Sequence, residues 1–144
     1  MFSRIIRELG HLLGLPALAP DATGALTLRI DGQDFILQYF EQGQDIYVIH
    51  RLGTLPEDEG ERARVQGLLL ERNCFFRGTG TGVVGTEGRD VYYTVRLRAD
   101  GLDGRELEQF LRAITAACDR LRRDMDSSPA QDNACPPIQN ILWG

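Results

Sequence analysis

The stretch that decides the fold is residues 25–52, ALTLRIDGQDFILQYFEQGQDIYVIHRL, which predicts three short strands in succession. In its first part apolar and polar residues alternate, the pattern of a half-buried strand, and the apolar ones are Leu26, Leu28 and Ile30. Short polar links at residues 31–32 and 41–45 separate the strands. Such short links predict antiparallel neighbours.

The second and third strands carry apolar side chains on both faces. Three helices can cover one face of a twisted five-stranded sheet fully and the other only in part, so we expect some of the following to be exposed in a lone subunit: Phe35, Ile36, Leu37, Tyr39, Phe40, Tyr47 and Ile49. We expect Phe35, Leu37, Tyr39 and Val48 in particular to line an exposed groove. Another polypeptide is the natural cover for such a face, so this surplus indicates protein binding.

Helices are predicted on both sides of these strands. An amphipathic pattern predicts a first helix over residues 2–13. Thr54 and Glu57 have the spacing of a capping box, which predicts a second helix from about Pro56 to Arg72. Asp103 and Glu106 have the same spacing and start a third helix that reaches about residue 125.

A hairpin is predicted between the second and third helices, with a Gly-rich strand at residues 79–85 and a second strand at 91–98. The element order is therefore helix, three strands, helix, two strands, helix, an α+β fold with a twisted antiparallel sheet. We expect a single domain over residues 1–125. Residues 126–144 are rich in Ser, Pro, Asp, Asn and Gln and predict a flexible tail, although it holds the apolar group Ile138, Ile141, Leu142 and Trp143.

The composition excludes several classes of function. A net charge of −5 argues against nucleic-acid binding, which needs a concentrated positive patch. The sequence contains no long apolar span and no signal-peptide pattern, so we expect a cytoplasmic protein that does not bind membranes. The three widely spaced cysteines predict reduced thiols rather than a disulfide framework.

No motif predicts catalysis, a metal site or a cofactor. Residues 80–85 match G-x-G-x-x-G, but the motif follows a helix and opens onto a hairpin, the reverse of a dinucleotide-binding loop. His11 and His50 are the two histidines, and neither has a second metal-type ligand three or four residues away. A small enzyme that uses His50 or Cys74 is a weaker alternative, because nothing in the sequence positions either group.

Four segments together resemble one protein family over residues 1–125. They are the end of the first helix, LLGLP at 12–16, the strand LTLRIDG at 26–32, the apolar strands that follow as far as Ile49, and the last helix with Leu107, Phe110, Leu111 and Ala117. With the chain length and acidic charge, this pattern resembles the class I type III secretion chaperones. These small acidic dimers hold effector proteins for injection by Gram-negative bacteria.

The resemblance implies an α-β-β-β-α-β-β-α fold and a homodimer formed by the second helix and the strand after it. The residues implied at the dimer interface are Val65, Leu68, Leu69, Phe75, Phe76, Val83 and Val84. It also implies that the N-terminal segment of an effector binds in extended form to grooves of the first helix and first three strands. The residues implied there are Phe2, Ile5, Ile6, Leu9, Leu13, Leu26, Leu28, Phe35, Leu37, Tyr39 and Val48.

The implied mechanism is binding without turnover and without ATP or metal. The bound effector segment is kept unfolded and soluble, and the complex is presented to the secretion machinery, with the secretion ATPase or sorting platform as a further partner. The alternative is an adaptor of the same fold that binds proteins outside secretion.

Overall fold

The computed structural model describes residues 1–127. Its elements are α1 (Phe2–Leu13), β1 (Ala25–Ile30), β2 (Gln33–Phe40), β3 (Asp45–Thr54), α2 (Glu59–Asn73), a short 3-10 turn η1 (Cys74–Phe76), β4 (Val83–Glu87), β5 (Asp90–Arg98) and α3 (Gly104–Asp126). The predicted element order and the α+β class are confirmed. The tail predicted after residue 125 falls largely on residues 128–144, outside the described residues.

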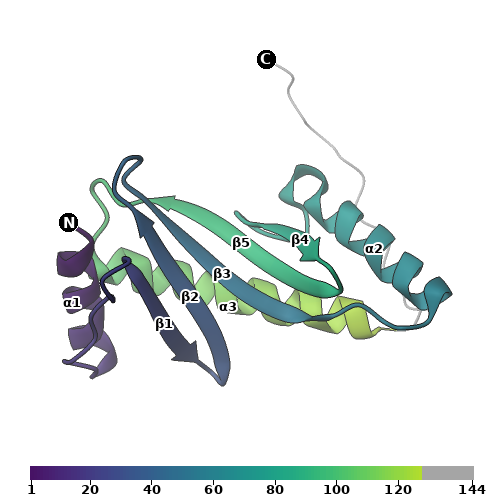
Figure 1. Cartoon of the computed structure of the whole chain (residues 1–144), viewed down its shortest axis with the longest axis horizontal. Helices are drawn as coiled ribbons and strands as arrows, with labels where there is room; N and C mark the ends of the chain where they lie inside the picture. The colour runs from purple at the N-terminus through teal and green to yellow at the C-terminus, as the bar shows by residue number, and fades with distance from the viewer. Residues whose placement is uncertain (128–144) are drawn as a thin grey trace, which may run out of the picture.

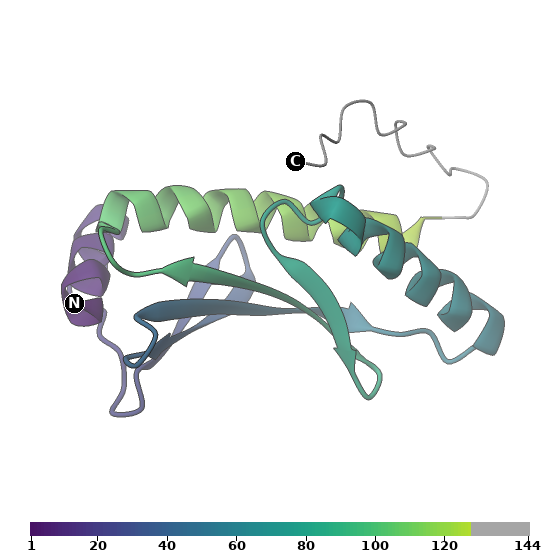
Figure 2. The same ribbon diagram turned by 90° about the horizontal axis from the view of Figure 1, so that it is seen from above.

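The five strands form one antiparallel sheet in the order β1-β2-β3-β5-β4. The long helix α3 runs across one face of this sheet, with α1 at one end and α2 near the other (Figures 1 and 2). Within residues 1–127, Figure 2 shows no helix on the opposite face, which we call the open sheet face. The edge strands of the sheet are β1 and β4.

The third helix begins where the sequence predicts. The Asp103 carboxylate accepts a hydrogen bond from the Glu106 N–H, and the Glu106 carboxylate accepts one from the Asp103 N–H. This reciprocal cap satisfies two backbone donors that the first turn of a helix leaves free.

The start predicted for the second helix is wrong. Thr54 is the last residue of β3. The N-cap of α2 is Asp58, four residues beyond the expected Thr54 cap, and its carboxylate accepts from the Glu61 N–H. Both spacings satisfy the capping pattern, and the pairing of Thr54 with Asp90 on β5 keeps Thr54 in the sheet.

The core lies between the sheet and the helices. Its fully buried large side chains include Ile5, Leu9, Phe35, Leu37, Val48, Tyr93, Leu107, Leu111 and Leu121. Among the described residues no helix is both long and apolar enough to cross a membrane.

The Gly-rich segment packs against the core. Its strand β4 begins at Val83, not at residue 79 as predicted. A Cβ on Gly82 would lie 2.3 Å from Cζ of Tyr93, and the Tyr93 hydroxyl donates to the Thr79 carbonyl at 2.8 Å. The glycine at this position therefore admits the Tyr93 ring, a packing role in place of the phosphate contact that the motif alone would suggest.

Candidate functional site

The strand and helix residues predicted to bind an effector lie mostly in the core. Nine of the eleven are buried: Phe2, Ile5, Ile6, Leu9, Leu26, Leu28, Phe35, Leu37 and Val48. Leu13 and Tyr39 are half-buried. The groove exposure expected for Phe35, Leu37 and Val48 is wrong, because these three side chains point toward the helices and are 0% exposed.

The neighbours of these residues supply the exposed apolar surface. On β2, Ile36 is 44% exposed and Phe40 is 52% exposed. Both belong to the apolar residues of which some were expected to be exposed. Ile36 pairs with Ile49, and the Phe40 ring meets that of Tyr47 edge to face at 5.3 Å. The surplus of apolar side chains is therefore real, and it lies on the open sheet face.

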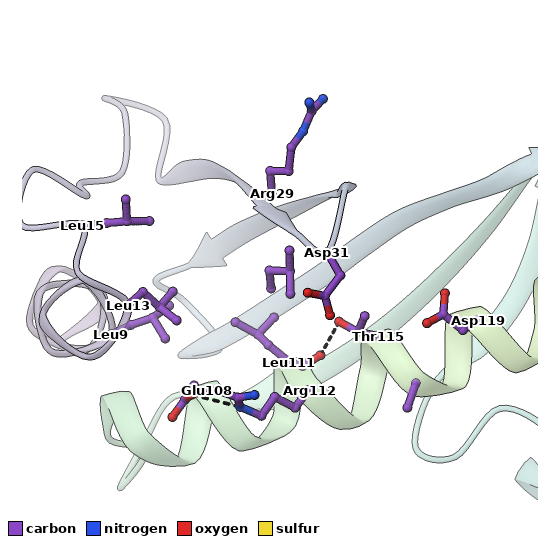
Figure 3. Close-up of a pocket in the computed structure, with 12 residues that line it drawn as sticks. Leu9, Leu13, Leu15, Arg29, Asp31, Glu108, Leu111, Arg112, Thr115 and Asp119 are labelled. Carbon is purple, nitrogen blue, oxygen red and sulfur yellow. Dashed lines mark hydrogen bonds and ion pairs between the residues drawn. The ribbon is translucent and has the colours of Figure 1, made fainter.

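A cavity of about 560 Å3 lies on the other side of the sheet, among α1, the end of β1 and the middle of α3 (Figure 3). We call it the α1–β1–α3 cavity. Its apolar wall consists of Leu9, Leu13, Leu15, Ile30, Leu111 and Ala116. This volume lies within the usual range of ligand pockets, about 300–1,000 Å3.

Sequence reasoning found part of this cavity. Leu9 and Leu13 were among the predicted binding residues, whereas Leu15, Ile30 and Leu111 were not. Leu15 directly follows Gly14, the residue that ends α1, and is 46% exposed. A large apolar residue just outside a helix was the signal that could have identified it.

Charged side chains rim the cavity. Arg112 pairs with Glu108 at 2.5 Å, and Arg29 pairs with Asp34 at 2.8 Å. The hydrogen bond from Arg29 holds the pKa of Asp34 below its ordinary value. Ion-paired side chains therefore surround an apolar interior.

The free edge of β1 runs beside this cavity. The Gly24 carbonyl accepts from the Tyr39 N–H on β2, whereas the backbone groups of Ala25 bond to Asp21 on the other side. Backbone groups alternate in direction along an antiparallel strand, so those of Thr27 and Arg29 also point away from β2. An extended peptide could bond to them and direct alternate side chains into the cavity.

A second apolar surface gathers around α2, η1 and β4. Its exposed members, which we call the α2–β4 surface, are Leu70 at 72%, Phe75 at 51%, Phe76 at 54% and Val83 at 47%. Of the residues predicted at a dimer interface, this surface contains Phe75, Phe76 and Val83. Leu68 is half-buried, while Val65, Leu69 and Val84 belong to the core. Leu70 was missed.

His50 lies in a polar cluster between the sheet and α3. Its Nε2 is 2.6 Å from Nη2 of Arg122, and its Nδ1 is 2.8 Å from the Asp34 carbonyl. Arginine can only donate, so Nε2 accepts and Nδ1 carries the proton that is donated to Asp34. Burial lowers the pKa of His50, and the facing Arg122 charge acts in the same direction. The imidazole is therefore neutral and structural.

This geometry predicts a loss of stability in mild acid. The pKa of His50 in the folded chain lies below its ordinary value of 6.5. The neutral form is thus favoured by folding, and its stabilisation is complete above pH 6.5 and is lost as the pH falls toward the folded-state pKa. We expect urea unfolding to show a steeper loss of stability between pH 7.5 and pH 5 for the native chain than for a His50→Leu variant. Equal slopes would contradict this role.

Of the two described cysteines, Cys74 is exposed and Cys118 is buried. Burial raises the pKa of the Cys118 thiol to about 12. Among residues 1–127 no three His, Cys, Asp or Glu side chains gather as a metal site would require. The arrangement is suited to binding an apolar chain segment.

Comparisons with known proteins bear on this arrangement. The model of the Tir chaperone protein (CesT) family matches residues 4–122. No match was found among curated proteins.

Several solved structures have a similar fold. A chain of the HopA1-SchA chaperone-effector complex matches with a TM-score of 0.68 and 13% identity, over 83% of this chain and 91% of that one. A second match is to the structure of the Yersinia pestis type III secretion chaperone SycH in complex with a stable fragment of YscM2. Its TM-score is 0.66 and its identity 17%, over 84% of this chain and 99% of that one. A chain of the ExsC-ExsE complex matches with a TM-score of 0.67 and 18% identity, over 84% of this chain and 90% of that one.

Proposed function

Because the chain belongs to the Tir chaperone protein (CesT) family, we propose that it is a cytoplasmic type III secretion chaperone. Its client is the N-terminal segment of an effector, which it binds in extended form and keeps soluble and competent for secretion. The observation that carries this proposal is an apolar cavity beside an unpaired strand edge.

The cavity and the edge offer complementary interactions. The outward backbone groups of Thr27 and Arg29 supply hydrogen bonds that do not depend on the client sequence, and the cavity selects apolar side chains. A segment held this way cannot fold or aggregate, and release requires no chemical step. The secretion ATPase or sorting platform as a further partner stays a prediction.

We further propose a homodimer formed through the α2–β4 surface. Phe75 and Phe76 are exposed and have φ angles of 55° and 56°, a left-handed conformation that costs roughly 1–2 kcal/mol per residue. Burying a fully exposed phenylalanine side chain stabilises by about 1.5–3 kcal/mol, and these rings are 51% and 54% exposed, so burial of the remainder supplies roughly half of that. Contact with a second subunit would therefore offset part of the strain that a lone subunit bears.

The client site is tested by a matched pair of leucines. Leu15 lines the cavity, whereas Leu12 is equally exposed, at 48% against 46%, but lies outside it. We expect Leu15→Asp to weaken client binding by roughly 30-fold or more, the effect of losing about 2 kcal/mol at a central contact. Leu12→Asp should change the affinity little.

The client for this test comes from coexpression of the tagged chain with neighbouring reading frames, followed by pull-down and calorimetric titration. Equal effects of the two substitutions would remove the cavity from the binding site. Capture of a partner that is not secreted would favour the adaptor alternative.

A further inference from the structure

The face of α3 that lines the α1–β1–α3 cavity continues to the C-terminal end of the helix. The α3 residues at its rim are spaced three or four apart: Glu108, Arg112, Thr115 and Asp119. Residues at this spacing lie on one helix face, and the same face continues through Arg122 to Asp126. This face of α3 therefore connects the cavity with the last residue of the helix.

The distances are short enough for the following segment to reach the cavity. At 1.5 Å per residue, Asp119 lies about 12 Å and Glu108 about 28 Å back along the axis from Ser127. Ile138 follows Ser127 by eleven residues, which span at most about 36–40 Å when extended. The whole length of the cavity is therefore within range of residues 138–143.

These six residues have the composition of a segment that is bound. The sequence IQNILW contains four large apolar side chains and no charge, whereas residues 126–137 are mostly small or polar. The apolar interior and charged rim of the cavity suit a segment whose apolar side chains are accompanied by the amides Gln139 and Asn140. Such a cluster left in water would expose an apolar patch to other proteins.

We propose that residues 138–143 occupy the α1–β1–α3 cavity of their own chain when no client is bound. The proposal rests on the proposed function, because it names an internal competitor for the client groove. The segment keeps the groove covered before an effector arrives, and a client binds by displacing it. Because the tail and the client compete, the apparent client affinity falls by the fraction of chains whose groove is already occupied.

A fluorescence measurement tests the proposal without any client. Trp143 is the single tryptophan of the chain, so its emission reports on this segment alone. We expect the native protein to emit at shorter wavelength than the urea-unfolded chain and to resist quenching by acrylamide. Emission identical to that of the unfolded chain would overturn the proposal.

Two substitutions on α3 locate the contact. Ala116 is exposed and lines the cavity, and Ala113 is exposed on the same helix but does not line it. Ala116→Arg should place a long charged side chain in the cavity and move Trp143 emission to the wavelength of the unfolded chain. Ala113→Arg should leave the emission unchanged, and circular dichroism checks that both variants keep their helices. A blue-shifted Ala116→Arg protein would assign Trp143 to another surface and overturn the proposal.

A mixture separates binding within one chain from binding between chains. Trp143→Phe and Ala116→Arg proteins are unfolded and refolded together in equal amounts. If each segment binds its own chain, the mixture emits like Ala116→Arg alone, since the intact cavities belong to chains without tryptophan. A blue-shifted fraction would show binding to a second copy and overturn the assignment to the same chain. These results do not depend on client capture, so failure of either proposal is recognised separately.

Discussion

Phe35→Ala is expected to lower the free energy of unfolding by about 3–5 kcal/mol, the range for removing a large aromatic side chain from a core. Phe35 is 0% exposed and stacks on the His50 ring with centroids 4.5 Å apart. It also pairs in register with Leu28 on β1 and His50 on β3, so its loss opens a cavity at the centre of the sheet.

Ile36 provides the control for this prediction, because it is the next residue of the same strand and faces the opposite way. It is 44% exposed, so Ile36→Ala should cost no more than about 1 kcal/mol. Urea denaturation at pH 7.5 and one fixed protein concentration measures both variants, since association contributes to apparent stability. Equal losses would mean that β2 presents its faces differently.

Phe76→Asp is expected to weaken the proposed homodimer by roughly 30-fold or more, because a carboxylate would replace an aromatic anchor at the α2–β4 surface. The substitution should not harm the lone subunit. Phe76 has a φ of 56°, and aspartate tolerates this left-handed conformation better than phenylalanine does. Sedimentation equilibrium gives the dissociation constant, and circular dichroism confirms that the fold is retained.

Phe40→Asp is the matched control for the dimer. Phe40 is 52% exposed against 54% for Phe76, but it lies on the open sheet face and contacts Tyr47. Its substitution should leave the dimer intact. The reverse result, with dissociation by Phe40→Asp alone, would move the subunit interface to the open sheet face.

Local patterns in the sequence predicted the elements that depend on local interactions. The reciprocal cap of Asp103 and Glu106 identified the start of α3, since both partners belong to one helical turn. The same pattern at Thr54 and Glu57 failed, because pairing between Thr54 and Asp90 extends β3 past it. Sheet pairing joins residues that are far apart in the chain, so a pattern within a few residues cannot predict it.

The candidate site could be predicted less completely. Sequence reasoning placed Leu9 and Leu13 at a client surface, and both line the cavity. The spacing of Leu111 on α3 is that of a core residue, and Leu111 is 2% exposed although it also lines the cavity. A cavity is the space left where α1, β1 and α3 diverge, and this space depends on how the three elements pack together.

By itself the sequence determined the order of the elements, the family resemblance and the surplus of apolar side chains in residues 25–52. The tertiary structure alone decided that Phe35 and Leu37 are core while Ile36 and Phe40 are exposed. The physical reason is that side chains alternate across a strand with a period of two, so apolar residues on both faces leave the inward face undefined. The packing of α3 and α1 against one face of the sheet makes that choice.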